Sequence, residues 1–233
     1  MTSYEGRNVV VTGGTGALGA AVVERLLRQG ARIHVPAWSA QDAARFPLGS
    51  DARVEVLGDV DLSDEVQVDA YYAALPPLWA SIHLAGGFAP GTLEDTSADT
   101  LRRMLSTNTI SAFLCCKAAA ARIRANGLDG GRIVNVGARP ALVPSAGVAA
   151  YAASKGAVTT LTLALAEELK GAGIWVNAVI PSTMDTPANR AGMPDADFST
   201  WPTTDEVAAT IEFLASPGNA CTRGALVPVV GRT

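Results

Sequence analysis

A tyrosine and a lysine four residues apart offer acid–base chemistry. Tyr151 and Lys155 begin an alanine- and leucine-rich stretch, residues 151–170, that predicts a helix, so both side chains lie on one helix face. A phenol has a pKa of about 10, and a neighbouring ammonium favours the phenolate and lowers that pKa. We therefore predict that Tyr151 donates or accepts a proton beside Lys155, which is also able to hold a ribose.

A glycine-rich motif near the start of the chain offers a place for a phosphate group. Residues 14–19 read Gly-Thr-Gly-Ala-Leu-Gly and match the pattern G-x-G-x-x-G. They follow a predicted strand at residues 8–12 and open a predicted helix at residues 17–28. Glycines let the backbone approach a pyrophosphate, whose charge the helix N-terminus stabilises. The motif in this context predicts a dinucleotide site.

The end of the second predicted strand bears on the choice of dinucleotide. An acidic residue about 20 positions after the first glycine binds the adenosine ribose of NAD in such sites. Here the strand at residues 32–35 is followed by Pro-Ala-Trp at 36–38, without an acid. Nothing there repels a 2′-phosphate, and Ser39 or Arg45 could meet one. The sequence therefore favours NADP slightly over NAD.

The sequence leaves both a cofactor-binding role and a structural role open for three further residues. Trp38 could stack on adenine or pack beneath a loop. Asp61 or Asp64, after the third predicted strand, could hydrogen-bond adenine or cap the helix that follows.

The elements that must position these residues alternate along the chain. Segments rich in β-branched residues alternate with alanine-rich ones, which predicts βαβ units and a parallel sheet of the α/β class. A length of 233 residues suggests one compact domain. Strands are predicted at residues 8–12, 32–35, 53–57, 81–84, 132–136, 174–180 and 225–230, and helices at 17–28, 97–125, 151–170 and from a capping box at Thr203 to 215.

Composition excludes several classes of protein. Hydrophobic residues make up 48% of the chain and charged residues 17%, which excludes disorder. A net charge of −4 argues against nucleic-acid and anionic-membrane partners, and the short apolar runs argue against a membrane span. The three cysteines form neither a disulfide framework nor a zinc motif, so we expect no metal and a reducing, cytoplasmic location.

One irregular stretch stands out between the sixth predicted strand and the last helix. Residues 181–202 are rich in proline, aspartate, asparagine and methionine. A loop of this length inside a compact domain is usually functional. We expect it to be a substrate loop or lid.

Taken together, these motifs resemble the short-chain dehydrogenase/reductase family. The glycine turn at 13–19, Leu-Ala-Gly at 84–86, Asn108, the Tyr151/Lys155 pair and Asn-Ala-Val at 177–179 fall in family order, and the resemblance spans residues 8–230. It implies a single doubly wound Rossmann domain over residues 1–233, with about seven parallel strands and helices on both faces. It also implies hydride transfer from a nicotinamide cofactor, and a homodimer or homotetramer paired through the two long helices.

The resemblance carries roles to individual residues. Tyr151 would be the acid/base, Lys155 would bind the nicotinamide ribose, and Asn108 would maintain a proton-relay water. The cofactor is expected to contact Gly13, Thr15, Gly16, Ala17, Leu18, Gly19, Trp38, Asp61, Leu62, Ala85, Gly86, Gly87, Lys155, Pro181 and Thr183.

Two departures from the family pattern affect the chemistry. Ala17 replaces the middle glycine of the turn, and Ala138 stands where the family has a serine, thirteen residues before the tyrosine. A methyl group cannot donate a hydrogen bond to a developing alkoxide. Ser145 could supply a substitute hydroxyl or could serve only as a turn residue.

The departures resemble one branch of the family, the quinonoid dihydropteridine reductases. That branch has similar Gly-Gly-x-Gly-Ala-Leu-Gly and Ala-Gly-Gly runs, here at 13–19 and 85–87, and lacks the serine, as in Gly-Ala-Arg at 137–139. The stretch at 184–201 resembles the branch most closely, and the end of the chain, 224–233, is similar as well. On this basis the substrate would contact Phe88, Ala138, Arg139, Ser145, Met184 and Asn189.

Other features disagree with the branch, and three functional hypotheses remain. Ala37 replaces the acid by which the branch favours NADH, and Asn108 is not expected there. The first hypothesis is an NAD(P)H-dependent reductase of a C=N or C=O substrate, such as a quinonoid dihydropterin, with Tyr151 as the proton donor. The second is an ordinary alcohol/ketone dehydrogenase in which Ser145 or a water on Asn108 replaces the serine. The third is a cofactor-binding protein without turnover.

Overall fold

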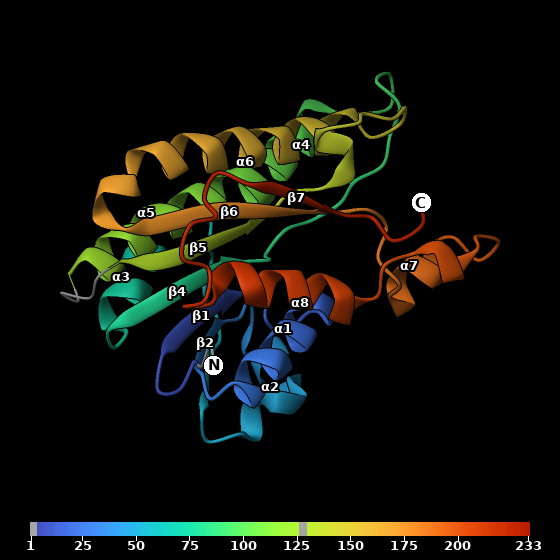
Figure 1. The fold of residues 1–233 in the computed structure, drawn as a ribbon. Coiled ribbons are helices and arrows are strands. Elements are labelled where there is room, and N and C mark those ends of the chain that lie inside the picture. The colour runs from blue at the N-terminus through green and yellow to red at the C-terminus, as the bar shows by residue number, and fades with distance from the viewer. Residues whose placement is uncertain (1–3, 126–129) are drawn as a thin grey trace.

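A sheet of seven parallel strands forms the centre of the molecule (Figure 1). The structure is a computed structural model that describes residues 4–125 and 130–233. The strand order is β3-β2-β1-β4-β5-β6-β7, which confirms the predicted α/β class and doubly wound topology. Residues 1–3 and 126–129 of the predicted domain lie outside the described residues. The strands are β1 (Asn8–Thr12), β2 (Arg32–Pro36), β3 (Val54–Leu57), β4 (Leu78–His83), β5 (Gly131–Val136), β6 (Ile174–Pro181) and β7 (Leu226–Val229).

The strand order reverses between β1 and β4. The chain runs outward from β1 to β3, returns to place β4 beside β1, and then continues outward to β7 on the other side. Loops leaving β1 and β4 at their carboxyl ends therefore diverge and leave a crevice, the place where open α/β sheets bind ligands.

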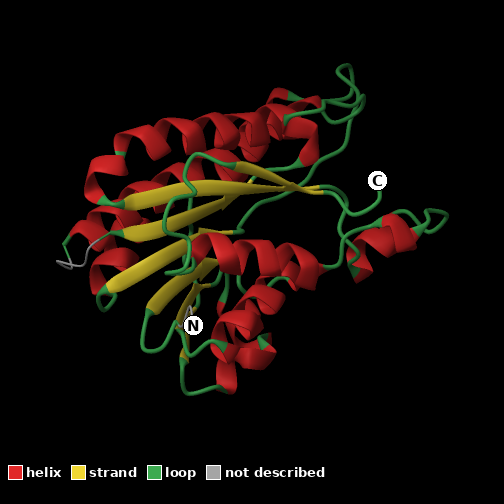
Figure 2. Cartoon of the chain, viewed as in Figure 1, coloured by secondary structure: helices red, strands yellow, loops and turns green. Residues whose placement is uncertain are grey.

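Helices cover both faces of the sheet (Figure 2). One face carries α1 (Ala17–Arg28) and α8 (Thr204–Ala215), whose apolar sides form one core cluster with strand residues such as Val11 and Ile33. The other carries α3 (Glu65–Ala74), α5 (Ser111–Arg124) and α6 (Ala149–Glu168), around a second cluster. Because both faces are covered, every residue of β4 and β5 is buried, as parallel strands require.

The long helix predicted at residues 97–125 is continuous but changes its winding. It runs through α4 (Ala98–Met104), a π-helical segment (Leu105–Ile110) and α5. A π-helical segment has wider turns than an α-helix, so it changes the directions of the side chains that follow. Such segments occur often at functional sites. Asn108 lies within this segment and is buried.

Other boundaries agree with the sequence prediction or depart from it locally. The capping box is present, with Thr203 Oγ1 accepting from Glu206 N at 3.2 Å and Thr203 N donating to Glu206 Oε2 at 2.7 Å. β4 begins at Leu78, earlier than predicted, because the residues after the two prolines pair with β1 at once. Two short helices, α2 (Ala40–Arg45) and α7 (Pro187–Gly192), interrupt stretches for which no helix was predicted.

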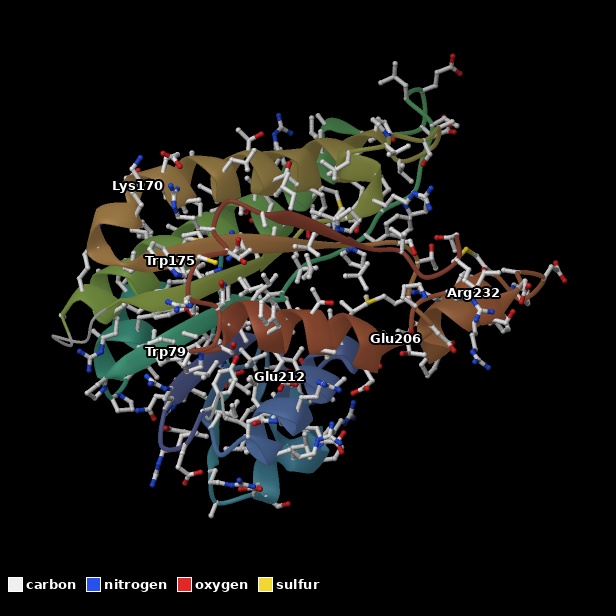
Figure 3. All side chains as sticks on the ribbon, viewed as in Figure 1. Trp79, Lys170, Trp175, Glu206, Glu212 and Arg232 are labelled. Atoms are coloured by element: carbon white, nitrogen blue, oxygen red, sulfur yellow. The ribbon has the colours of Figure 1, made fainter. Side chains whose placement is uncertain are left out.

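The two ends of the sheet carry different features. At the amino end, the guanidinium of Arg132 lies 4.9 Å from the ring centroid of Trp79 and 5.7 Å from that of Trp175, whose positions Figure 3 marks. The carboxyl end carries the glycine turn, the start of α6 and the loop that bears α7. In the described part of the chain, none of the helices has the length and apolar character to cross a membrane.

Candidate active site

The glycine turn after β1 has a backbone that tolerates few side chains. Gly13 has a φ of +66°, and a Cβ at Gly19 would lie 2.2 Å from the carbonyl oxygen of Gly13. Ala17, by contrast, is exposed at the first position of α1, so its methyl group fits where the family has glycine. No side chain caps α1 at Gly16 and its first turn has no acidic residue, so its N–H groups suit an anion.

Two cavities meet at this turn. One, of about 450 Å³, extends from the turn over the ends of β5 and β6 to the start of α6. The other, of about 530 Å³, extends over the ends of β2 and β3 to the π-helical segment. Both are lined by Gly13, Gly16, Leu84 and Gly86. We call them the catalytic cavity and the adenosine cavity, because together they offer an elongated site of the shape that a dinucleotide needs.

Tyr151 and Lys155 both line the catalytic cavity, one turn apart on α6. Lys155 is 6% exposed, and its Nζ donates to the carbonyl oxygen of Val136, at the end of β5, at 2.9 Å. The Tyr151 ring meets Phe88 edge to face, with centroids 4.9 Å apart and planes at 81°. The helix thus presents a phenol and an ammonium at the crevice.

The pKa of Tyr151 differs from the sequence prediction. We predicted that the Lys155 ammonium lowers it, but burial raises the pKa of Tyr151 to about 12. Burial also lowers the pKa of Lys155 to about 8. The ammonium is bound to the Val136 carbonyl, and removal of the phenol from water disfavours the phenolate. Tyr151 is therefore protonated at neutral pH, in the form that donates a proton.

Asn108 connects the loop after β4 to α6. Its Oδ1 accepts from Gly87 N at 2.8 Å, and its Nδ2 donates to Gly87 O at 3.1 Å and to Ser154 Oγ at 2.9 Å. The Ser154 hydroxyl donates in turn to the carbonyl oxygen of Tyr151 at 2.7 Å. Both amide hydrogens of Asn108 are thus committed to protein atoms, and its side chain lines neither cavity. Its predicted role in holding a relay water stays a prediction.

The loop after β5 carries the alanine that replaces the family serine. Ala138 is buried and lines the catalytic cavity, so a methyl group faces the site there. Ser145 is exposed and lines neither cavity, so the predicted substitute hydroxyl lies outside the site. Arg139, predicted to contact substrate, also lines neither cavity, because its Nη1 donates to Thr233 Oγ1 at 3.1 Å at the end of the chain.

The lid expected at 181–202 contains more regular structure than a loop. Thr186 caps α7 by accepting from Asn189 N at 3.2 Å, and Asn189 Nδ2 donates to Met184 O at 2.8 Å. On its outer side Arg190 forms a two-pronged ion pair with Asp185, at 2.5 and 2.7 Å. Arg232 is labelled in Figure 3, and its backbone N–H donates to Thr200 O at 2.8 Å, which connects residues near the end of the chain to the segment 181–202.

The structure gives Asp61 and Asp64, which had two interpretations from the sequence, different roles. Asp64 caps α3 by accepting from Val66 N at 2.9 Å and Gln67 N at 3.2 Å. Asp61 lines the cavity instead, with its Oδ1 accepting from Ser63 N at 2.8 Å. Trp38 lines the same cavity and is 70% exposed, so it does not pack beneath a loop.

Most of the residues predicted for the site converge on these cavities. The catalytic cavity receives Gly13, Gly16, Ala17, Leu18, Gly19, Gly86, Gly87, Phe88, Ala138, Tyr151, Lys155, Pro181, Thr183, Met184 and Asn189. The adenosine cavity receives Gly13, Thr15, Gly16, Trp38, Asp61, Leu62, Ala85 and Gly86. Those outside both are Asn108, Arg139 and Ser145.

Several lining residues escaped the sequence analysis. Val136 and Gly137 could have been predicted, because Val136 ends the strand predicted at residues 132–136 and Gly137 follows it at the carboxyl edge of the sheet. Thr186 and Met193 belong to the segment 181–202, where no periodic pattern indicates which side chains face inward. Arg103 and Thr107 lie at the junction of α4 and the π-helical segment, whose changed winding the sequence does not reveal.

The described residues hold no cluster of three or more histidine, cysteine, aspartate or glutamate side chains suited to a metal ion. The donor set of the site is instead a phenol, an ammonium and backbone N–H groups. These groups, with glycines whose Cβ would collide with neighbouring backbone, fit a dinucleotide cofactor.

Comparison with known proteins agrees with this description. Residues 7–196 match the family model of the short chain dehydrogenases. The chain is 34% identical over 242 residues to the uncharacterized oxidoreductase YgfF of Escherichia coli strain K12, covering 95% of this chain and 98% of that one. It is 33% identical over 255 residues to an NADPH-dependent aldehyde reductase-like chloroplastic protein of Arabidopsis thaliana, covering 97% and 93%. The chain therefore belongs to the short-chain dehydrogenase family.

Solved structures show the same fold. The crystal structure of gox2181 superposes with a TM-score of 0.91 at 25% identity, covering 99% of this chain and 96% of that one. ElxO with NADP bound superposes with a TM-score of 0.88 at 24% identity, covering 97% and 98%.

Proposed function

We propose that the protein is an NADPH-dependent reductase that adds hydride to the C=O or C=N carbon of an uncharged substrate, with Tyr151 as the proton donor. The observation that carries this proposal is that Tyr151 and Lys155 line the same cavity as the glycine turn. Burial raises the pKa of Tyr151, so the phenol holds its proton at neutral pH. A reduction needs a donor in this form, whereas an oxidation needs a base.

The residues of both cavities would hold the cofactor. The glycine turn and the start of α1 would take the pyrophosphate, Asp61 and Trp38 the adenine, and Lys155 the nicotinamide ribose. The nicotinamide supplies a hydride when bound. NADPH is favoured because Ala37 and Trp38, directly after β2, carry no charge to repel a 2′-phosphate, and a relative 33% identical is named an NADPH-dependent aldehyde reductase-like protein.

The walls of the catalytic cavity indicate the class of substrate. Phe88, Pro140, Met184 and Met193 offer apolar surface, and Lys155 is the sole charged residue among those that line it in the described chain. Because Lys155 is assigned to the cofactor ribose, a charged substrate would lack a partner there, and burial of an unpaired charge is costly. The cavity therefore suits an uncharged substrate.

The missing serine favours a substrate that needs a single proton donor. With Ala138 buried at that position and Ser145 outside the cavity, Tyr151 is the hydroxyl donor that we assign to the reacting atom. An electron-poor conjugated C=N bond, as in a quinonoid dihydropterin, accepts hydride readily and develops charge on one nitrogen. A carbonyl substrate is the second candidate, favoured by the relative named an aldehyde reductase-like protein.

A substrate panel followed at the nicotinamide absorbance tests the proposal. We expect NADPH oxidation with a quinonoid dihydropterin or an aromatic aldehyde, and slow reverse oxidation of alcohols. Ala138→Ser adds a second donor and should increase turnover of the aldehyde relative to the pterin. Turnover of aliphatic alcohols alone would contradict the proposal, and NADPH binding without any turnover would favour a non-catalytic role.

We also propose that the protein is a homo-oligomer in the reducing cytosol. Ile110 and Phe113 of the long helix and Leu163 of α6 are between 44% and 48% exposed, on helices that cover the same face of the sheet. Apolar surface of this kind suits pairing of two copies. The exposed free thiol of Cys221 supports a reducing compartment. Sedimentation at several concentrations tests the oligomer, and a monomer at all of them would contradict it.

A further inference from the structure

The tip of β2 does not offer a cation to a cofactor phosphate. Ser39 and Arg45 were the candidates that the sequence offered for this role, but neither lines the adenosine cavity. The Ser39 hydroxyl donates to Asp42 Oδ2 at 2.8 Å and accepts from Asp42 N at 3.1 Å, as the cap of α2. Asp59 Oδ1 accepts from Ala40 N at 3.1 Å at the same helix end. Both carboxylates are thus engaged at the start of α2, and neither residue lines the adenosine cavity.

A positively charged side chain on α4 lines the same cavity. Arg103, in the last turn of α4, is exposed and lines the adenosine cavity together with Trp38. Of the residues lining it in the described part of the chain, Arg103 alone carries a positive charge, and Asp61 alone a negative one. The Asp61 Oδ1 atom is engaged by Ser63 N and Ser63 Oγ, at 2.8 and 2.7 Å.

The guanidinium of Arg103 has no partner among the described residues. Its neighbour Arg102 shows the contrast, because Arg102 Nη1 donates to Asp99 Oδ1 at 2.6 Å and lines neither cavity. Two adjacent arginines on one helix thus differ in direction: one is paired on the surface, and the other borders the cavity unpaired. A guanidinium with free N–H groups matches phosphate oxygens in a two-pronged geometry.

Trp38 supplies the second half of this arrangement. Its indole is 70% exposed and borders the cavity. A large exposed aromatic surface beside a cavity is suited to stack on a flat heterocycle. An adenine against Trp38 would place the ribose and its 2′ substituent in the cavity that Arg103 borders.

We propose that Arg103 binds the 2′-phosphate of NADPH and sets the preference for NADPH over NADH, with Trp38 stacking on the adenine. This inference rests on the proposed function, because it names the residues by which the reductase selects its cofactor. The sequence led us to expect that residues at the end of β2 distinguish NADPH from NADH. The inference assigns this distinction to a residue of α4 instead.

Fluorescence titration of Arg103→Gln and the matched control Arg102→Gln tests this. Four probes are used: NADPH, NADH, 2′,5′-ADP and 5′-AMP. For Arg103→Gln we expect weaker binding of NADPH and 2′,5′-ADP by on the order of tenfold to a hundredfold, since one charged hydrogen-bond pair is lost. Binding of NADH and 5′-AMP should stay within about twofold of wild type. Arg102→Gln should change none of the four, and Arg103→Lys should keep part of the selectivity.

Equal weakening of all four probes, or no change in any, would overturn the role of Arg103 while leaving the reductase proposal intact. Failure of the wild-type protein to bind NADPH would overturn both. A thermal melt of each variant shows that it is folded. Raising the salt concentration should weaken NADPH binding more in the wild type than in Arg103→Gln, because salt screens an exposed phosphate contact.

Discussion

The side chain of Asn108 binds both backbone groups of Gly87, accepting from its N–H at 2.8 Å and donating to its carbonyl at 3.1 Å. The same amide reaches Ser154 on α6, whose hydroxyl bonds the carbonyl of Tyr151. One buried amide thereby fixes the loop after β4 relative to the helix that carries the proton donor. Asn108 is in this respect a positioning residue.

Asn108→Ala should destabilise the protein and slow turnover. It leaves the partly buried backbone groups of Gly87 and the buried Ser154 hydroxyl without their partner, which costs roughly 2–4 kcal/mol in the free energy of unfolding. Urea denaturation measures that cost, and steady-state kinetics should show a fall in kcat larger than the rise in KM. The exposed Thr92, which binds Asp95 at 2.6 Å, provides a control, since Thr92→Ala should cost less than about 1 kcal/mol. Equal costs would contradict the positioning role.

Tyr151→Phe should lower kcat by about 100-fold or more, because the proton donor is lost, while NADPH binding persists. Turnover in single-turnover experiments and NADPH affinity by titration measure the two effects separately. Retention of wild-type kcat would remove Tyr151 from the mechanism. Ser145→Ala is the matched control on the neighbouring loop, and we expect it to leave kcat unchanged, since Ser145 lines neither cavity.

Lys155→Met should stabilise the protein at neutral pH while abolishing activity. Burial lowers the pKa of Lys155 from 10.5 to about 8, so the folded state opposes its charge, at a cost of up to about 3 kcal/mol. The lost hydrogen bond to Val136 offsets about 1 kcal/mol of the gain.

The pH dependence of this effect has a definite sign. Between about pH 8 and 10.5 the unfolded chain holds a proton on Lys155 that the folded chain has released, so rising pH stabilises the folded wild type. The advantage of Lys155→Met should therefore be full below about pH 8 and shrink towards pH 10.5. Comparing the two proteins at each pH cancels the buried Cys115 and Cys116 thiols, whose raised pKa values act in the opposite direction above pH 9. A constant difference across this range would contradict the interpretation.

Short-range patterns explain why much of the site was predictable. Tyr151 and Lys155 share a helix face by their spacing alone, and the glycine turn needs only the strand before it and the helix after it. Ala138 was recognisable from its distance to Tyr151 within one βα unit. Such relationships depend on local geometry, which the sequence encodes directly.

What the sequence by itself determined is the parallel α/β class, the glycine turn, the Tyr151/Lys155 pair and the missing serine. Only the tertiary structure decided which way loop and junction side chains point: Ser145 outward, Arg139 to the chain end, and Arg103 to the adenosine cavity. It also decided the direction of the Tyr151 pKa shift, which burial turns upward. Direction and burial depend on contacts between segments distant in the chain, and no spacing within a single segment encodes them.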